Sequence, residues 1–201
     1  SMIVASKMQQ KPMSILADLK ALRPISRRLQ STTAEQINNC LRQLADLTES
    51  HTPELLAANQ MDLDRMDVAN PKYDRLLLNE NRLRAIAADL RRVAELPSPL
   101  GRSQESRTLA NGLELRRMTV PIGVVGIVFE SRPNVTFDVF ALTLKSGNVS
   151  VLKGSRDAAV SNRAIKALID QALLSVGLSG ACYLAAPERE ALEPILKADG
   201  L

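Results

Sequence analysis

Two short polar stretches, each at the end of an apolar run, contain the residues that could carry out chemistry. Glu130-Ser131-Arg132-Pro133-Asn134 follows the apolar run 122–129, and Lys153-Gly154-Ser155-Arg156 closes the run 149–153. In open parallel sheets, ligands bind outside the carboxyl ends of the strands. If these two runs form neighbouring parallel strands, both polar stretches face the same crevice.

The second stretch has the composition of a turn that binds ribose or phosphate. It offers two cations, a hydroxyl and a glycine, and the helix expected at 157–176 would begin there with free N–H groups. Arg156 suits the 2′-phosphate of NADP, and the acid that commonly binds the 2′-hydroxyl of NAD is not seen in this turn. Because the chain has neither G-x-G-x-x-G nor a Walker A motif, a basic turn that only caps the strand remains the alternative.

Asn134 has two candidate roles. It lies at an expected helix start, directly after Pro133, where an asparagine commonly acts as the N-cap and accepts a backbone N–H. Its amide could instead point into the crevice and donate a hydrogen bond to a developing oxyanion. The residue types alone favour the N-cap and leave the second role open.

The first hundred residues are expected to be helical. Thr32-Thr33-Ala34-Glu35 fits a capping box, in which the hydroxyl and the carboxylate satisfy N–H groups reciprocally. Thr52-Pro53 predicts an N-cap and a first-turn proline for a second helix, which runs through Met61. A third helix is expected from about Asn79 to Glu95. The apolar faces of the first and third helices consist of Ile37, Cys40, Leu41, Leu44 and Leu47, and of Leu83, Ile86, Leu90 and Val93.

The rest of the chain has the pattern of an α/β fold. After a linker at Pro97–Gly101, Asn111-Gly112 predicts a two-residue turn in a hairpin at about 105–120, a possible edge for self-association. Strands and helices then alternate, which favours a partial doubly wound parallel sheet. We therefore divide the chain into a helical region (1–100), a hairpin or linker (101–120) and a partial nucleotide-binding domain (121–201). The expected elements of this last part are strands at 122–129, 149–153 and 182–185 and helices at 134–146, 157–176 and 187–197.

Composition excludes several classes of function. An apolar content of 45% and a charged content of 24% are typical of a globular protein, and only 2% of the residues are aromatic. That scarcity argues against a stacking platform for single-stranded nucleic acid or RNA. The net charge of +4 comes from arginines dispersed among acids, which favours a solvated mixed-charge surface over a nucleic-acid-binding one.

The cysteines and the single histidine indicate no metal site. Cys40 and Cys182 lack the spacing of a zinc site or a disulfide framework, and Cys40 is expected in the core. His51, the only histidine, is expected in a solvated loop, which excludes a His-dependent triad built within this chain. The chain shows no signal peptide and no apolar run that could span a membrane, so we expect a cytoplasmic location.

Four motifs together resemble gamma-glutamyl phosphate reductase, of the aldehyde dehydrogenase superfamily. They are VPIGVVG (120–126), ESRPNVT (130–136), LKSGN (144–148) and VLKG (151–154). The resemblance extends to ELLAANQMDLDR at 54–65 and to most of residues 74–102. ESRPNVT is highly specific, whereas PIGVVG occurs across the wider superfamily.

The resemblance implies an activity and roles for several residues. The family reduces L-glutamyl 5-phosphate with NADPH, giving L-glutamate 5-semialdehyde and phosphate, a step in proline biosynthesis. Asn134 matches the oxyanion asparagine and Lys153 the lysine at the adenosine ribose; Arg156 stands where NAD-preferring relatives often carry glutamate. Ser131, Arg132 and Pro133 would line the cofactor side, with Gly154 and Ser155 beside Lys153. Arg132 could instead meet the substrate phosphate.

The resemblance also implies what the chain lacks. The family's nucleophile is a cysteine that neither Cys40 nor Cys182 matches, so we expect an N-terminal fragment that is inactive alone. The full-length protein would be an NADP-dependent reductase and a homo-oligomer, with the glutamate 5-kinase that supplies its substrate as a candidate partner, and without metal, nucleic acid or membrane. Alternatives are the reductase part of a bifunctional pyrroline-carboxylate synthase and a non-catalytic nucleotide-binding or interaction module.

Overall fold

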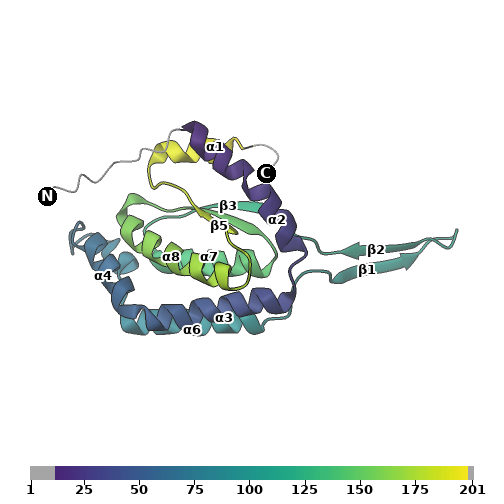
Figure 1. Cartoon of the computed structure of the whole chain (residues 1–201), viewed down its shortest axis with the longest axis horizontal. Coiled ribbons are helices and arrows are strands. Elements are labelled where there is room, and N and C mark those ends of the chain that lie inside the picture. Colours follow the sequence, from purple (N-terminus) through teal and green to yellow (C-terminus); the bar gives the residue numbers. More distant parts are fainter. Residues whose placement is uncertain (1–11, 199–201) are drawn as a thin grey trace.

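The structure, a computed structural model, describes residues 12–198 and is built in layers (Figure 1). A small parallel sheet lies in the middle. Two helices cover one face of it and are covered in turn by a further helical layer, while short helices from both ends of the described chain cover the other face. A hairpin projects from this body. The mixed α/β architecture expected from the sequence is confirmed.

The sheet consists of three parallel strands in the order β3-β4-β5. Their bounds are Val124–Val128 for β3, Val149–Lys153 for β4 and Cys182–Leu184 for β5. Each connection is helical: α7 (Pro133–Lys145) joins β3 to β4, and the turn η1 (Arg156–Ala158) with α8 (Ala159–Ser175) joins β4 to β5. Every residue of the central strand is buried, as its continuous apolar sequence predicts.

The remaining helices form the outer layers. The longer pair, α3 and α6, packs together against α7, and α4 packs against α8. On the opposite face, α2 lies against β3 and β4, and α1 packs against α9. The bounds are α1 Pro12–Lys20, α2 Leu22–Gln30, α3 Ala34–Ser50, α4 Thr52–Leu63, α5 Tyr73–Leu76, α6 Glu80–Glu95, η2 Arg189–Ala191 and α9 Leu192–Leu196.

One continuous hydrophobic core joins these layers. It contains leucines and isoleucines of the early helices together with Phe137, Phe140 and the apolar side chains of β4. Cys40 is fully buried in this core, so the expectation that it packs as a small apolar residue is confirmed. No helix among residues 12–198 combines the length and the apolar character needed to cross a bilayer.

Helix starts in the first hundred residues follow local capping chemistry, with two corrections. The capping box of α3 lies one residue later than expected, since Thr33 accepts from the Gln36 N–H and the Gln36 side chain accepts from the Thr33 N–H. The N-cap of α4 is His51, not Thr52, and the helix continues to Leu63. His51 therefore ends α3 and begins α4, and there is no separate loop. Asn79 caps α6 as predicted.

The hairpin consists of β1 (Ser103–Thr108) and β2 (Glu114–Met118), all of whose residues are exposed. Its turn differs from the predicted two-residue turn, because Leu109 N–H donates to Leu113 O at 2.8 Å and encloses three residues. Gly112, with φ of +85°, supplies the left-handed conformation that such a loop needs. A two-stranded hairpin of this kind is marginally stable without support.

The strand predicted at 122–129 is shorter than expected. Ile122 is 84% exposed, and Gly123, with φ of +123°, turns the chain before β3 begins. Gly123 N–H donates to the Asn148 side chain at 2.8 Å, which fixes the entry into the sheet. The helix expected at 187–197 is divided into η2 and α9, and the helix expected at 157–176 begins with the η1 turn.

Candidate functional site

The two polar stretches meet at the carboxyl end of the sheet. β3 and β4 are neighbours, and Phe129 N–H, just past β3, donates to Lys153 O at 3.0 Å. Beyond that point the hydroxyls of Ser131 and Ser155 lie 3.1 Å apart. The two turns are therefore in contact, as the parallel pairing predicted.

Ser131 is the centre of this contact. Its side chain is 2% exposed, and its hydroxyl donates to Asp157 Oδ2 at 2.6 Å. Lys72 Nζ lies 3.9 Å from the same carboxylate oxygen. Asp157 directly follows Arg156, but it was not among the site residues predicted from the sequence. The carboxylate fixes the two turns relative to each other.

A pocket of about 390 Å³ opens beside the turn after β4. Its walls combine small and apolar residues with four polar or charged ones: Ser155 from the turn after β4, Asn162 and Arg163 from α8, and Glu188 from the loop after β5. The full lining is Gly154, Ser155, Ala159, Asn162, Arg163, Leu184, Ala185, Ala186, Pro187 and Glu188. We call it the β4–β5 pocket. Two of the predicted cofactor residues, Gly154 and Ser155, line it.

Asn162 leaves no room for a side chain at position 154. A Cβ at this position would lie 2.4 Å from Asn162 Nδ2 and 3.5 Å from Phe129 Cε2. The first distance is far inside van der Waals contact, and Asn162 is itself buried, with 2% of its surface exposed. A side chain at 154 must therefore displace Asn162 from the pocket wall.

Gly154→Ala is expected to destabilise the fold by about 1–3 kcal/mol, the usual cost of overpacking a well-packed site. Urea unfolding followed by circular dichroism measures this loss. Gly126→Ala is the matched control, because its Cβ would lie at an ordinary 3.5 Å from Ile195 Cγ2. Equal stability of the two variants would contradict the packing argument.

Unlike a lysine with a free ammonium that could bind a ribose, Lys153 is buried and hydrogen-bonded within the chain. Its ammonium donates to Gly154 O and to Pro187 O, each at 2.8 Å, and the residue is 7% exposed. Burial lowers the pKa of Lys153, while Glu188 acts in the opposite direction. The side chain joins the end of β4 to the loop after β5, and it is not among the residues that line the pocket.

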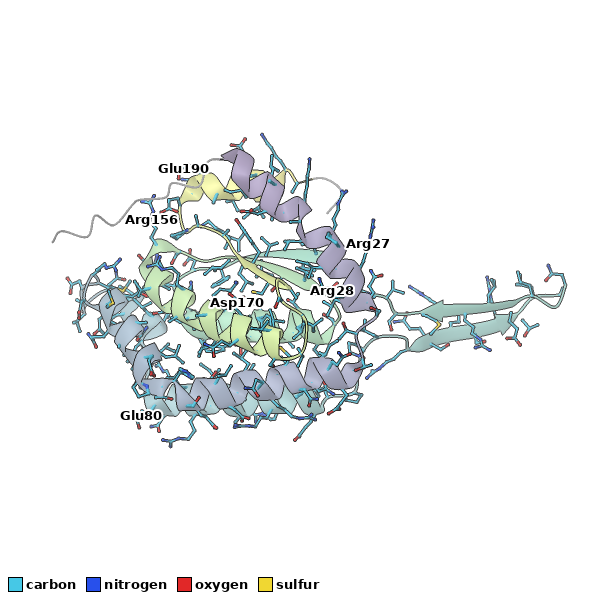
Figure 2. The ribbon with its side chains drawn as sticks, in the orientation of Figure 1. Arg27, Arg28, Glu80, Arg156, Asp170 and Glu190 are labelled. Carbon is cyan, nitrogen blue, oxygen red and sulfur yellow. The ribbon has the colours of Figure 1, made fainter. Side chains whose placement is uncertain are left out.

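Arg156, by contrast, is exposed at the start of η1. Figure 2 shows it at the surface, toward the side of the molecule where Glu190 lies. Its guanidinium is therefore accessible to an anion beside the β4–β5 pocket.

The start of α8 does not offer the free N–H groups that the sequence suggested. Asp62, from α4, accepts from Val160 N–H at 3.2 Å and from Ser161 N–H at 2.7 Å. The Ser161 hydroxyl also donates to this carboxylate at 2.7 Å. Asp62 is 2% exposed, so this helix terminus is already occupied by a carboxylate from within the chain. A phosphate is thus excluded from these two N–H groups.

Asn134 and Arg132 line a second pocket, also of about 390 Å³, between the start of α7 and the helices α5 and α6. We call it the α6–α7 pocket. The full lining is Asp74, Arg75, Leu77, Leu78, Arg82, Ala85, Ile86, Asp89, Arg132, Asn134 and Asp138. Arg82 is held in place, since it donates to Asp74 O and Leu77 O, both at 2.6 Å. The structure therefore places Arg132 away from the β4–β5 pocket.

Asn134 is not the N-cap of α7. The N-cap position belongs to Arg132, which makes no capping hydrogen bond through its side chain, and the buried Pro133 is the first helical residue. Asn134 is exposed one residue further on. The N-cap role that residue type favoured is wrong, and the amide faces the α6–α7 pocket.

Neither cysteine is available as a nucleophile. Burial raises the pKa of Cys40 to about 12 and that of Cys182 to about 11. Both thiols are buried, and Cys182 begins β5, at the end of the sheet opposite the two turns. Within residues 12–198, no group of three or more His, Cys, Asp or Glu side chains is arranged to hold a metal ion.

Comparison with known proteins agrees with this arrangement. No protein-family model matches the chain. The chain is 54% identical over 188 residues to the gamma-glutamyl phosphate reductase of Chlorobaculum parvum, covering 93% of this chain and 45% of that protein. It thus spans about half the length of the curated relatives it matches. The resemblance read from the motifs is confirmed.

Solved structures give the same result for the fold. The gamma-glutamyl phosphate reductase of Thermotoga maritima superposes with a TM-score of 0.85 at 32% identity, over 90% of this chain and 45% of that one. An NAD-dependent benzaldehyde dehydrogenase from Corynebacterium glutamicum matches at 0.75 and 19% identity, over 96% of this chain and 40% of that one. An engineered glycolyl-CoA reductase with bound NADP⁺ matches at 0.63 and 15% identity, over 93% and 40%. The fold is of the aldehyde dehydrogenase type.

Proposed function

We propose, from its similarity to gamma-glutamyl phosphate reductases, that this chain is part of an NADPH-dependent enzyme that reduces L-glutamyl 5-phosphate to L-glutamate 5-semialdehyde. The sequence identity over nine tenths of the chain carries the proposal. The contact between Ser131 and Ser155 supports it, because it joins the turn that lines the β4–β5 pocket to the turn that leads into the α6–α7 pocket.

In this proposal the two pockets bind different ligands. NADPH, when bound, supplies the hydride that reduces the acyl group. The β4–β5 pocket would hold the adenosine end, which fits the small and apolar part of its walls. The α6–α7 pocket would hold the acyl phosphate, with Asn134 donating to the acyl oxygen and Arg132 near the phosphate. This assigns Arg132 to the substrate.

Some of the assigned residues act through others. Lys153 would shape the β4–β5 pocket through its bonds to Gly154 O and Pro187 O, and Ser131 would fix the distance between the two turns. The nucleophilic cysteine of the family would come from outside this chain, because Cys40 and Cys182 are buried and have raised pKa values. We therefore propose that this chain does not turn over substrate alone.

Arg156→Glu tests the cofactor assignment. A guanidinium that binds the 2′-phosphate contributes a charge-assisted hydrogen bond, so the substitution is expected to weaken NADPH binding about 10- to 100-fold. NADH, which lacks that phosphate, should bind nearly as before. Fluorescence titration of the full-length protein with each cofactor gives both constants.

Arg116→Glu, in the exposed hairpin, makes the same change in net charge away from the pocket and is the control. If Arg156→Glu loses the same affinity for NADPH as for NADH, the assignment of Arg156 to the 2′-phosphate is wrong.

A second candidate function has the same fold but no catalytic activity. A non-catalytic nucleotide-binding or interaction module would bind the adenosine end but would show no dependence of any reaction on Asn134. The reductase part of a bifunctional pyrroline-carboxylate synthase would share both pockets. Self-association through the exposed hairpin, a glutamate kinase partner and a cytoplasmic location stay predictions.

A further inference from the structure

Asn162 is a buried amide with one end fixed and the other end directed to the β4–β5 pocket. Its Oδ1 accepts from the Thr136 hydroxyl at 2.7 Å, and both residues are almost fully buried. Within residues 12–198, no acceptor takes a hydrogen bond from its Nδ2, although the residue lines the pocket. Nδ2 is not enclosed, because among the described residues the one fully buried side-chain atom without a partner is Ser150 Oγ, so this donor is open to a ligand or water in the pocket.

Two neighbours hold the amide in this position. Thr136 is on α7, two residues after Asn134, and its hydroxyl fixes the orientation of the Asn162 side chain. Gly154 leaves the space that Nδ2 occupies, since a Cβ there would lie 2.4 Å from this atom. The donor is therefore oriented before any ligand arrives, which lowers the entropic cost of binding.

The walls beside Nδ2 indicate the kind of acceptor. Leu184, Ala185, Ala186 and Pro187, from β5 and the loop after it, form a side of small apolar groups, and Ala159 faces the pocket from α8. This apolar part of the wall suits the flat face of a heterocycle, whereas Ser155, Arg163 and Glu188, which also line the pocket, offer polar partners to a ribose or a phosphate. A purine offers ring nitrogens as acceptors in such a slot.

We propose that Asn162 is a specificity-determining residue that donates a hydrogen bond from Nδ2 to a ring nitrogen of a purine in the β4–β5 pocket. Thr136 is its positioning residue. The inference rests on the proposed function, which places the adenosine end of the cofactor in this pocket, and it adds the group that recognises the base.

Adenosine 5′-monophosphate and its 1-deaza, 3-deaza and 7-deaza analogues test the proposal, each titrated into the chain. One analogue should bind wild-type chain about 3- to 10-fold more weakly than the parent, the effect of one lost hydrogen bond. Asn162→Asp keeps the acceptor for Thr136 and removes the donor. It should weaken binding of the parent nucleotide by a similar factor. In that variant the same analogue and the parent nucleotide should bind with equal affinity.

Nuclear magnetic resonance supplies a second readout. The Asn162 side-chain NH₂ signals, identified as the pair absent from Asn162→Asp, should shift when the nucleotide is added. Thr136→Val should alter these signals in the free chain and weaken binding, whereas Thr136→Ser should restore both. Thr143→Val is the matched control, since that hydroxyl donates within its own helix to Val139 O.

Each result decides a different question. Equal binding of the parent and all three analogues to wild-type chain would overturn the role of Asn162, as would an unchanged affinity in a folded Asn162→Asp. If Asn162→Asp does not fold, the analogues on wild-type chain still decide. If wild-type chain binds no adenosine nucleotide at all, the proposed cofactor site fails and this inference with it.

Discussion

Replacing Asn134 by alanine in the full-length protein is expected to lower kcat by about 10²–10³, the usual effect of losing one oxyanion donor. The structure supports a clean experiment. The amide lies exposed in the first turn of α7, faces the α6–α7 pocket and is not the N-cap, so its removal takes away no capping bond. Steady-state kinetics with glutamyl phosphate would show kcat and kcat/KM falling together, as expected for a contact made in the transition state.

Asn81→Ala is the matched control for that experiment. Asn81 is also an exposed asparagine at the second position of a helix, since α6 begins at Glu80, and it does not line the α6–α7 pocket. It should keep kcat and the unfolding midpoint. If Asn134→Ala also keeps kcat, the oxyanion role is wrong; if it unfolds the protein, the amide is structural.

Asp62→Ala is expected to have the largest effect on stability, about 3–4 kcal/mol of unfolding free energy. The substitution removes the acceptor at the start of α8, and each of the three donors left unpaired costs about 1 kcal/mol, the lower end of the usual range, since water can reach part of the site. The affected groups are the N–H groups of Val160 and Ser161 and the Ser161 hydroxyl. Such a loss is a large part of the total stability of an ordinary domain.

Urea unfolding of Asp62→Ala measures this loss, and Asp64→Ala is the control on the same helix. Asp64 is exposed and accepts only a surface hydrogen bond from Gln60, so its replacement should change stability by at most about 0.5 kcal/mol. Asp62→Asn keeps one acceptor oxygen and should fall between the two. Similar midpoints for Asp62→Ala and Asp64→Ala would show that the start of α8 needs no cap.

The sequence predicts those features of the fold that depend on local patterns. Strand β4 has the predicted bounds because Val149, Val151 and Leu152 favour a buried strand and the Lys153-Gly154 turn ends it. The capping box of α3 was misplaced by one residue, because Thr32-Thr33 and Glu35-Gln36 provide two boxes with the same spacing. Gly112 predicted the hairpin but not the length of its loop.

The site could be predicted only where its contacts are short in sequence or implied by strand pairing. Neighbouring parallel strands predicted that the turns at Ser131 and Ser155 would meet. The partner of Lys153, Pro187 O, lies 34 residues away, and Asp62 lies 98 residues from Val160. Nothing in the local sequence of either residue identifies such a distant partner, so neither contact was predicted.

The layer of α1, α2 and α9 has a consequence for the order of folding. It joins the two ends of the described chain: α1 packs against α9, and Tyr183 Oη donates to Asp18 Oδ2 across 165 residues. During synthesis, α1 and α2 therefore leave the ribosome well before α9, and their packing is complete only after α9 has followed. Contacts so distant in sequence slow folding, since a long loop must close before they form. Until then, one face of the sheet lacks its full cover.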